Sequence, residues 1–141
     1  MNRAILTVSL FWGALVACSD SSTAPNPVIG RYELVSVNGI ALPAQIVKAD
    51  TTVVFVADTL NVNADGTYSQ HEWTRVTIGT VTAPDSSVSI GTYTHNGTMY
   101  MFTDAADQST VAGTFANGGG DVSGSGAVVL GVALTLAYTH L

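Results

Sequence analysis

The sequence predicts an all-β fold, an antiparallel up-and-down meander of seven or eight strands that closes into a barrel. Three observations predict it. Beyond residue 28 the hydrophobic period is mostly two, which is the period of a strand and not of a helix. β-branched and aromatic residues fill these segments, as in "TTVVFVADTLNV" at residues 51–62. Turn signals occur at short spacing with no long crossover, which favours a barrel; a β-sandwich is the alternative.

The first half of the predicted domain contains three long segments with strand character. Residues 30–38, "GRYELVSVN", alternate in polarity and end at an Asn-Gly turn signal. Residues 40–50, "IALPAQIVKAD", form the one stretch compatible with a short helix, although its proline limits the length. The strand at 51–62 leads into the hairpin turn "NADG", and a further long strand is expected over 67–81. The next turn is expected at "APDSS", residues 83–87.

The second half continues the hairpin pattern to the end of the chain. Strands at 88–94 and 98–103 flank a turn at His95-Asn96-Gly97, and "STVAGTFA" at 109–116 is another strand. "NGGGDVSGSG" predicts a loop or the start of a strand, and residues 127–141 form one strand or two. Glycines at 79, 91 and 113 suit strands that bend sharply within a closed sheet.

The N-terminus has the pattern of a secretion signal. Residues 4–17, "AILTVSLFWGALVA", form an apolar segment after Arg3 that is too short to span a bilayer. Leu15-Val16-Ala17-Cys18 resembles the lipobox of bacterial lipoproteins. This resemblance implies a signal peptide over 1–17, cleavage before Cys18, and a lipid anchor attached to Cys18. The alternatives are an uncleaved N-terminal helix and an ordinary signal sequence with an inert cysteine.

Composition predicts a tether after the cysteine, and the lipobox resemblance implies a location. Residues 18–27 are rich in Ser, Thr and Pro, so they predict a flexible tether between the anchor and a folded domain over 28–141. In lipoproteins of this kind, an Asp directly after the cysteine favours retention at the inner membrane, and here Ser19 occupies that position. The expected location is the cell envelope, at the periplasmic face of the outer membrane, with the lipid anchor holding the protein to the membrane.

The folded part opens with Gly30, Tyr32 and Leu34, and it continues with the turn Asn38-Gly39, the hairpin Asp65 to Tyr68, and Gly91-Thr92-Tyr93. With these motifs it is similar to the bacterial lipocalin-like domains of small envelope lipoproteins. Two features depart from those domains, because Tyr32 replaces the commoner Trp and the final "YTHL" lacks the Arg that often crosses the barrel floor. The resemblance implies a barrel that either encloses a small lipophilic ligand or is filled by side chains.

Composition and spacing favour no enzyme, no cofactor and no metal site. The net charge is −6, or −7 once Arg3 leaves with the signal peptide, so nucleic acid is not an expected partner. His71 and Glu72 are neighbours in a predicted strand and therefore point to opposite faces. His95 lies in a predicted turn and His140 near the end, which is not a metal-ligand pattern. No catalytic residues are expected.

A small-molecule binding protein is the function that these observations favour. Phe55, Trp73, Met99 and Met101, with Phe102, are the large apolar side chains expected to touch an interior cavity. Because neighbours in a strand alternate, only one residue of the pair 101–102 can point inward. Trp73 is expected to point inward with its indole N–H bonded to a polar partner. Packing of a filled core is nevertheless the favoured interpretation of these residues, because any small barrel needs such side chains. A further alternative is that the protein docks an unknown envelope partner.

Overall fold

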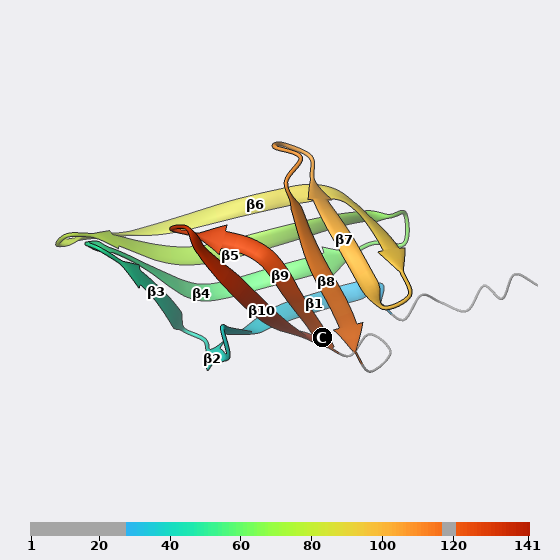
Figure 1. The fold of residues 1–141 in the computed structure, drawn as a ribbon, viewed down its shortest axis with the longest axis horizontal. Coiled ribbons are helices and arrows are strands. Elements are labelled where there is room, and N and C mark those ends of the chain that lie inside the picture. The colour runs from blue at the N-terminus through green and yellow to red at the C-terminus, as the bar shows by residue number, and fades with distance from the viewer. Residues whose placement is uncertain (1–27, 117–120) are drawn as a thin grey trace, which may run out of the picture.

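The computed structural model describes residues 28–116 and 121–141 (Figure 1). The predicted signal peptide, the tether and Cys18 lie outside the described residues. Strands make up most of the described chain, which contains no helix. The strands are β1 (Gly30–Val37), β2 (Ile40–Ala41), β3 (Ala44–Lys48), β4 (Thr51–Val62), β5 (Thr67–Ile78), β6 (Val81–Asn96), β7 (Met99–Asp104), β8 (Thr110–Ala116), β9 (Asp121–Val129) and β10 (Val132–His140).

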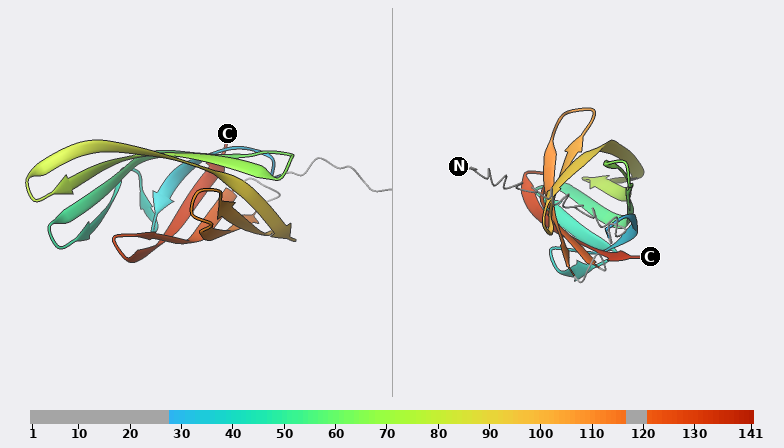
Figure 2. Two further views of the ribbon diagram at one scale, coloured as in Figure 1. Left: turned by 90° about the horizontal axis from the view of Figure 1, so that it is seen from above. Right: turned by 90° about the vertical axis from the view of Figure 1, so that its right-hand side faces the viewer.

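Eight of these strands form a closed antiparallel barrel. From β4 to β10 each strand pairs with the next one in the chain, and β1 closes the ring by pairing with both β10 and β4. The short strands β2 and β3 extend β1 and β4 outside this ring. Figures 1 and 2 show β4–β6 crossing β7–β10 at a large angle, so the barrel is flattened into two layers. The predicted up-and-down barrel is therefore confirmed in preference to the sandwich.

The stretch that suggested a short helix forms strands instead. Residues Ala44–Lys48 pair with Thr51–Phe55 as a hairpin. Ala44 and Ile46 are buried while their neighbours are exposed, which is the period of a strand. β1 pairs only with the last part of β4, from Thr59 to Val62. The first part of β4 therefore has backbone N–H and C=O groups available on that edge, and residues Ala44–Lys48 pair with them.

The sequence predicted a turn at residues 83–87, but the chain reverses its direction before these residues. It turns at Gly79-Thr80, where Gly79 has a φ of 59°. Residues 83–87 belong to β6, and Pro84 pairs with Arg75 of β5. Along this part of β6 only β5 is paired, because β7 joins from Gly91 onward. Proline is tolerated on such an edge, since no ladder on the free side needs its missing N–H.

The other predicted hairpins are where the sequence indicated. The turn at Asn63–Gly66 joins β4 to β5, and Asp65 accepts hydrogen bonds from the Thr67 amide (3.0 Å) and hydroxyl (2.6 Å). β6 and β7 meet at Gly97, which has a φ of 61°. The final apolar segment forms part of two strands, because Leu130 and Gly131, both with positive φ, make a turn between β9 and β10.

Aromatic side chains fill one end of the barrel. Tyr100 and Phe115 meet edge to face with ring centroids 4.5 Å apart, and Tyr68 meets Phe102 in the same way at 5.2 Å. Tyr32 is fully buried against Phe115, and its hydroxyl donates to the Val28 carbonyl over 2.7 Å. These side chains fill that end of the barrel, so the empty interior space lies between this end and the opposite one.

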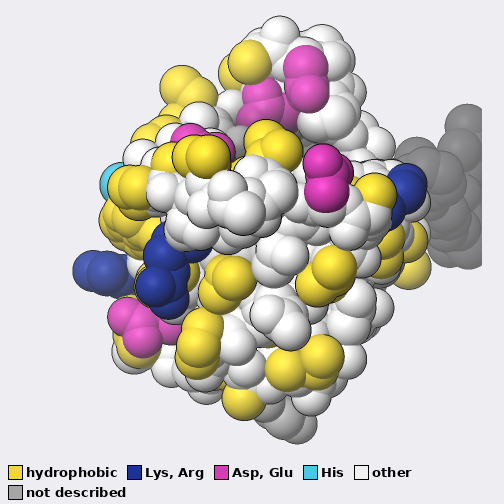
Figure 3. Space-filling view, turned by 90° about the vertical axis from the view of Figure 1, so that its left-hand side faces the viewer, with side chains coloured by type: hydrophobic (Ala, Val, Ile, Leu, Met, Phe, Trp, Pro, Cys, Tyr) yellow, Lys and Arg dark blue, Asp and Glu magenta, His cyan; other side chains and the backbone are white. Residues whose placement is uncertain are grey.

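The outer surface carries scattered apolar side chains. Figure 3 shows them over one end of the molecule in small groups separated by polar atoms, with charged groups interspersed. This surface is ordinary for a protein of this size. Across the described residues, no helix has the length and apolarity that crossing a bilayer requires.

Candidate functional site

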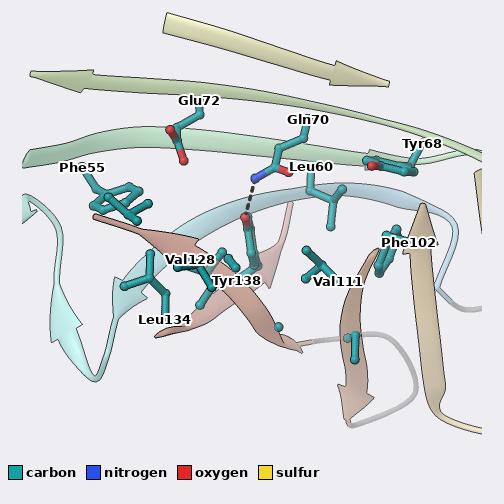
Figure 4. Close-up of a pocket in the computed structure, with 16 residues that line it drawn as sticks. Phe55, Leu60, Tyr68, Gln70, Glu72, Phe102, Val111, Val128, Leu134 and Tyr138 are labelled. Atoms are coloured by element: carbon teal, nitrogen blue, oxygen red, sulfur yellow. Dashed lines mark hydrogen bonds between the residues drawn. The ribbon is translucent and has the colours of Figure 1, made fainter. Parts of the chain in front are cut away.

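The interior contains a cavity of about 180 Å³ between β5 and the layer of β8–β10 (Figure 4). Aromatic residues Tyr68 and Phe102 close it on one side, and Phe55 and Leu134 lie at the other. Val128 lines the cavity and is also 62% exposed, so the cavity reaches the surface beside β9. A cavity of about 150 Å³ is enough to hold benzene, so this one has room for a single small ring compound.

One wall of the cavity is polar because Gln70 and Tyr138 line it, and both side chains belong to a hydrogen-bonded network with the buried Asp58. The Tyr138 hydroxyl donates to Asp58 Oδ2 over 2.6 Å. Gln70 Nε2 donates to the same oxygen over 2.6 Å and lies 3.1 Å from the Tyr138 hydroxyl (Figure 4). The network joins β4, β5 and β10, so it connects the two layers of the barrel across the interior.

A β-bulge in β4 brings Asp58 into this network. The register of β4 against β5 shifts between Phe55 and Ala57, which leaves Val56 without an opposite residue. Phe55 points inward before the bulge and Asp58 points inward after it, although a regular strand would place them on opposite faces. Asp58 consequently lies directly opposite Glu72, and two inward-facing acids occupy neighbouring strands.

Asp58 is a buried acid with one unused oxygen. It is 2% exposed, and its Oδ1 has no hydrogen-bond partner among the described residues. Burial raises the pKa of the Asp58 carboxyl above its usual range, and the hydrogen bonds from Tyr138 and Gln70 oppose this rise. Burial and the neighbouring Asp58 in turn raise the pKa of the Tyr138 hydroxyl well above its usual range, so Tyr138 stays protonated as a donor.

Glu72 is the one charged residue among the described residues that line the cavity. Burial, followed by Asp58 and Asp85, raises the pKa of Glu72 to about 7. The basic side chains within the described part of the chain are all exposed on the outside, so none compensates this charge. Glu72 therefore changes its charge near neutral pH and does so inside a largely apolar cavity.

The residues predicted to touch the cavity separate into two groups. Phe55 and Phe102 line it. Met99 and Met101 are 60% and 43% exposed, because β7 alternates and directs Tyr100 and Phe102 inward instead. Their expected interior position is wrong, and the expectation that only one of residues 101 and 102 points inward is confirmed.

Trp73 also lies outside the cavity, which corrects its predicted inward position. It is 38% exposed and lies on the outer face of β5, where the centroids of its ring and the His71 ring are 3.8 Å apart. The opposite face of β5, with Gln70 and Glu72, points inward. The polar face is the inner one because Asp58 and Tyr138 offer it buried partners. His71 and Glu72 do point to opposite faces, as the strand pattern predicted.

The polar wall itself was not predicted. Gln70 and Glu72 share one face with Tyr68 in a period of two, and this alternation was the signal that could have identified them. Asp58 had no such signal, because a strict period of two counted from Phe55 places it on the outside. Tyr138 lies in the final strand, whose partners depend on barrel closure. Over the ranges that the structure describes, no group of His, Cys, Asp and Glu side chains is arranged to hold a metal ion.

Comparison with known proteins adds no relative, since no family model matches the sequence and no curated protein or solved structure matches it significantly.

Proposed function

We propose that this protein is a lipid-anchored protein of the bacterial cell envelope, with a lipocalin-like barrel that binds one small, largely apolar molecule. The observation that carries the binding function is the cavity of about 180 Å³, which combines apolar walls with a few convergent polar groups. This combination is typical of small-molecule sites, in which apolar contacts supply affinity and polar groups supply orientation. The resemblance of residues 15–18 to a lipobox supports the anchor and the location.

The size of the cavity favours a compact ligand. Pockets for drug-sized molecules measure about 300–1,000 Å³, which is larger than this cavity. A single six-membered ring with a short substituent is the appropriate scale. A protein that only docks an envelope partner would have no need of this interior space, so the cavity favours binding over that alternative.

Filling the cavity provides the test. We expect benzyl alcohol, titrated into the purified full-length chain, to shift amide NMR signals of cavity residues saturably. Val111→Phe, which places a larger side chain in the cavity, should abolish these shifts. The matched control is Val88→Phe, the same change at a residue 64% exposed on β6, and it should leave binding unchanged.

Two results would contradict the proposal. One is the absence of saturable shifts in the wild-type protein, and the other is equal binding by wild type and Val111→Phe. Ala127→Leu is a second filling variant of the cavity wall, and it replaces Val111→Phe if that variant does not fold.

A further inference from the structure

One wall of the cavity carries an acidic side chain, Glu72, that lacks a hydrogen-bond donor among the described residues. Glu72 is directed from β5 into the cavity (Figure 4), and no hydrogen bond to its carboxylate is present among the described residues. The Gln70 amide nitrogen and the Tyr138 hydroxyl already donate within the network, to Asp58 and, for Gln70, to Tyr138. Glu72 is therefore a free acceptor at the surface that a ligand would contact.

A second buried oxygen indicates the same need for a donor. Asp58 lies opposite Glu72 in the β4–β5 ladder, and its Oδ1 has no partner among the described residues although only 2% of the residue is exposed. An unsatisfied buried carboxylate oxygen is costly, so such atoms are normally paired. Glu72 therefore lacks a hydrogen-bond donor at the cavity wall, and one oxygen of the neighbouring Asp58 lacks a donor as well.

No positive charge within the described residues balances this wall. Arg31, Lys48 and Arg75 are exposed outside the barrel, and Lys48 donates to the Leu130 carbonyl over 2.7 Å. An anionic head group, such as that of a fatty acid, would meet the Glu72 carboxylate and no cation. A cationic head group would meet an unpaired acceptor in a medium of low polarity, where opposite charges attract strongly.

We propose that the ligand of this cavity is a small primary amine with an apolar ring or a short hydrocarbon body, whose ammonium group donates to the Glu72 carboxylate. This inference rests on the proposed function, because it names the class of ligand that the same cavity takes. The apolar body occupies the space between Phe55 and Leu134, and the ammonium group lies at the polar wall. The volume limits the body to about one ring.

The electrostatics of the wall predict how binding depends on pH. The ionisable groups around Glu72 are Asp58 of β4, Asp85 of β6 and Tyr138 of β10. The charge of His71, on the outer face of β5, lowers the pKa of Asp58. With a pKa of about 7, Glu72 is largely neutral at pH 5 and ionised at pH 8. Amine binding therefore strengthens between these pH values, whereas binding of a neutral ligand does not.

Three probes of similar shape and different charge test the proposal on the full-length chain. They are benzylamine, benzyl alcohol and benzoate, each titrated at pH 8 and followed by NMR shifts of cavity amides. We expect benzylamine to bind about tenfold or more tightly than benzyl alcohol, and benzoate not to bind. Glu72→Gln should remove the advantage of benzylamine and leave benzyl alcohol nearly unchanged. The matched control is Glu33→Gln, the same charge change at an exposed residue of β1, which should keep the advantage.

The outcomes separate this inference from the proposed function. If all three probes bind the cavity with similar affinity, or if Glu72→Gln keeps the amine preference, the amine inference is overturned while the binding function stands. If no probe binds the cavity, both are overturned. Glu72→Met, which removes the same carboxylate and keeps a side chain of similar length, provides a second variant for the case in which Glu72→Gln does not fold, and it should also remove the advantage of benzylamine.

Discussion

At the scale of single residues, the polarity of the barrel interior depends on where a few side chains find partners. Gln70 and Tyr138 both donate to Asp58 Oδ2, and these hydrogen bonds stabilise a polar inner face on β5 in an otherwise apolar barrel. Glu72 shares that face without a partner of its own among the described residues, so its raised pKa reflects the destabilisation of the folded state when the carboxyl ionises.

The pKa of Glu72 predicts a stability that falls with increasing pH. Because its folded-state pKa of about 7 exceeds the ordinary 4.5, the folded state binds this proton more tightly, and the free energy of unfolding decreases as pH rises between these values. Glu72→Gln removes this loss. We expect it to be more stable than wild type at pH 8 by on the order of 2 kcal/mol, allowing for partial contact with water, and the difference to shrink at pH 5.

Urea unfolding of both proteins at the two pH values measures this difference. Glu33→Gln, at an exposed position on β1, is the control and should show no comparable gain at pH 8. A stability difference between wild type and Glu72→Gln that is the same at pH 5 and pH 8 would contradict the assignment.

At the scale of elements, β6 shows how one strand serves both layers. It pairs with β5 along most of its length and with β7 only from Gly91 onward. At Gly91 the neighbouring backbone comes so close that a Cβ would collide with the carbonyl oxygen of Thr103 and press against the Tyr68 ring. This position is where the long strands cross to the short ones, and the close approach requires glycine.

Replacing Gly91 should therefore cost more than replacing a turn glycine. We expect Gly91→Ala to lower the free energy of unfolding by about 2–3 kcal/mol, because backbone atoms must move apart. Gly97→Ala is the matched control, since Gly97 has a φ of 61° but open space around its Cα, and it should cost about 1 kcal/mol. Equal losses for the two variants, measured by urea unfolding, would show that the crowding at Gly91 is relieved at little cost.

At the scale of the whole molecule, the barrel is a closed sheet with its own interior cavity. β1 pairs with β10, the last strand of the chain, and also with β4. Each strand of the ring therefore pairs with a neighbour on both sides along at least part of its length, so the ring has no edge strand. A domain of this kind needs no partner to bury its core. This suits the proposal that the chain works at the membrane surface, held there by a lipid on Cys18.

The proposed anchor predicts the effect of losing its attachment residue. Cys18→Ala should abolish incorporation of a clickable palmitate analogue and release the protein from the membrane fraction, because no thiol is left to carry the lipid. The change lies far from the barrel residues in sequence, so near-UV circular dichroism should remain that of the wild type. Persistent labelling in the variant would exclude lipidation at Cys18.

Local patterns in the sequence were sufficient to predict the all-β class, the up-and-down connections and most hairpins, because alternation and turn chemistry are local properties. The "NADG" turn, the hairpin at Gly97 and the strand 51–62 needed no distant information. Phe55 and Phe102 were also predicted at the cavity.

Tertiary structure alone decided the polar wall and the side on which Trp73 lies. The face that β5 turns inward depends on partners from other strands, and those partners are Asp58 and Tyr138. Asp58 faces inward only because of a bulge, which inserts one residue and leaves no reliable trace in a pattern of period two. Tyr138 reaches the site only when the barrel closes and brings the last strand opposite β5, 68 residues from Gln70 along the chain.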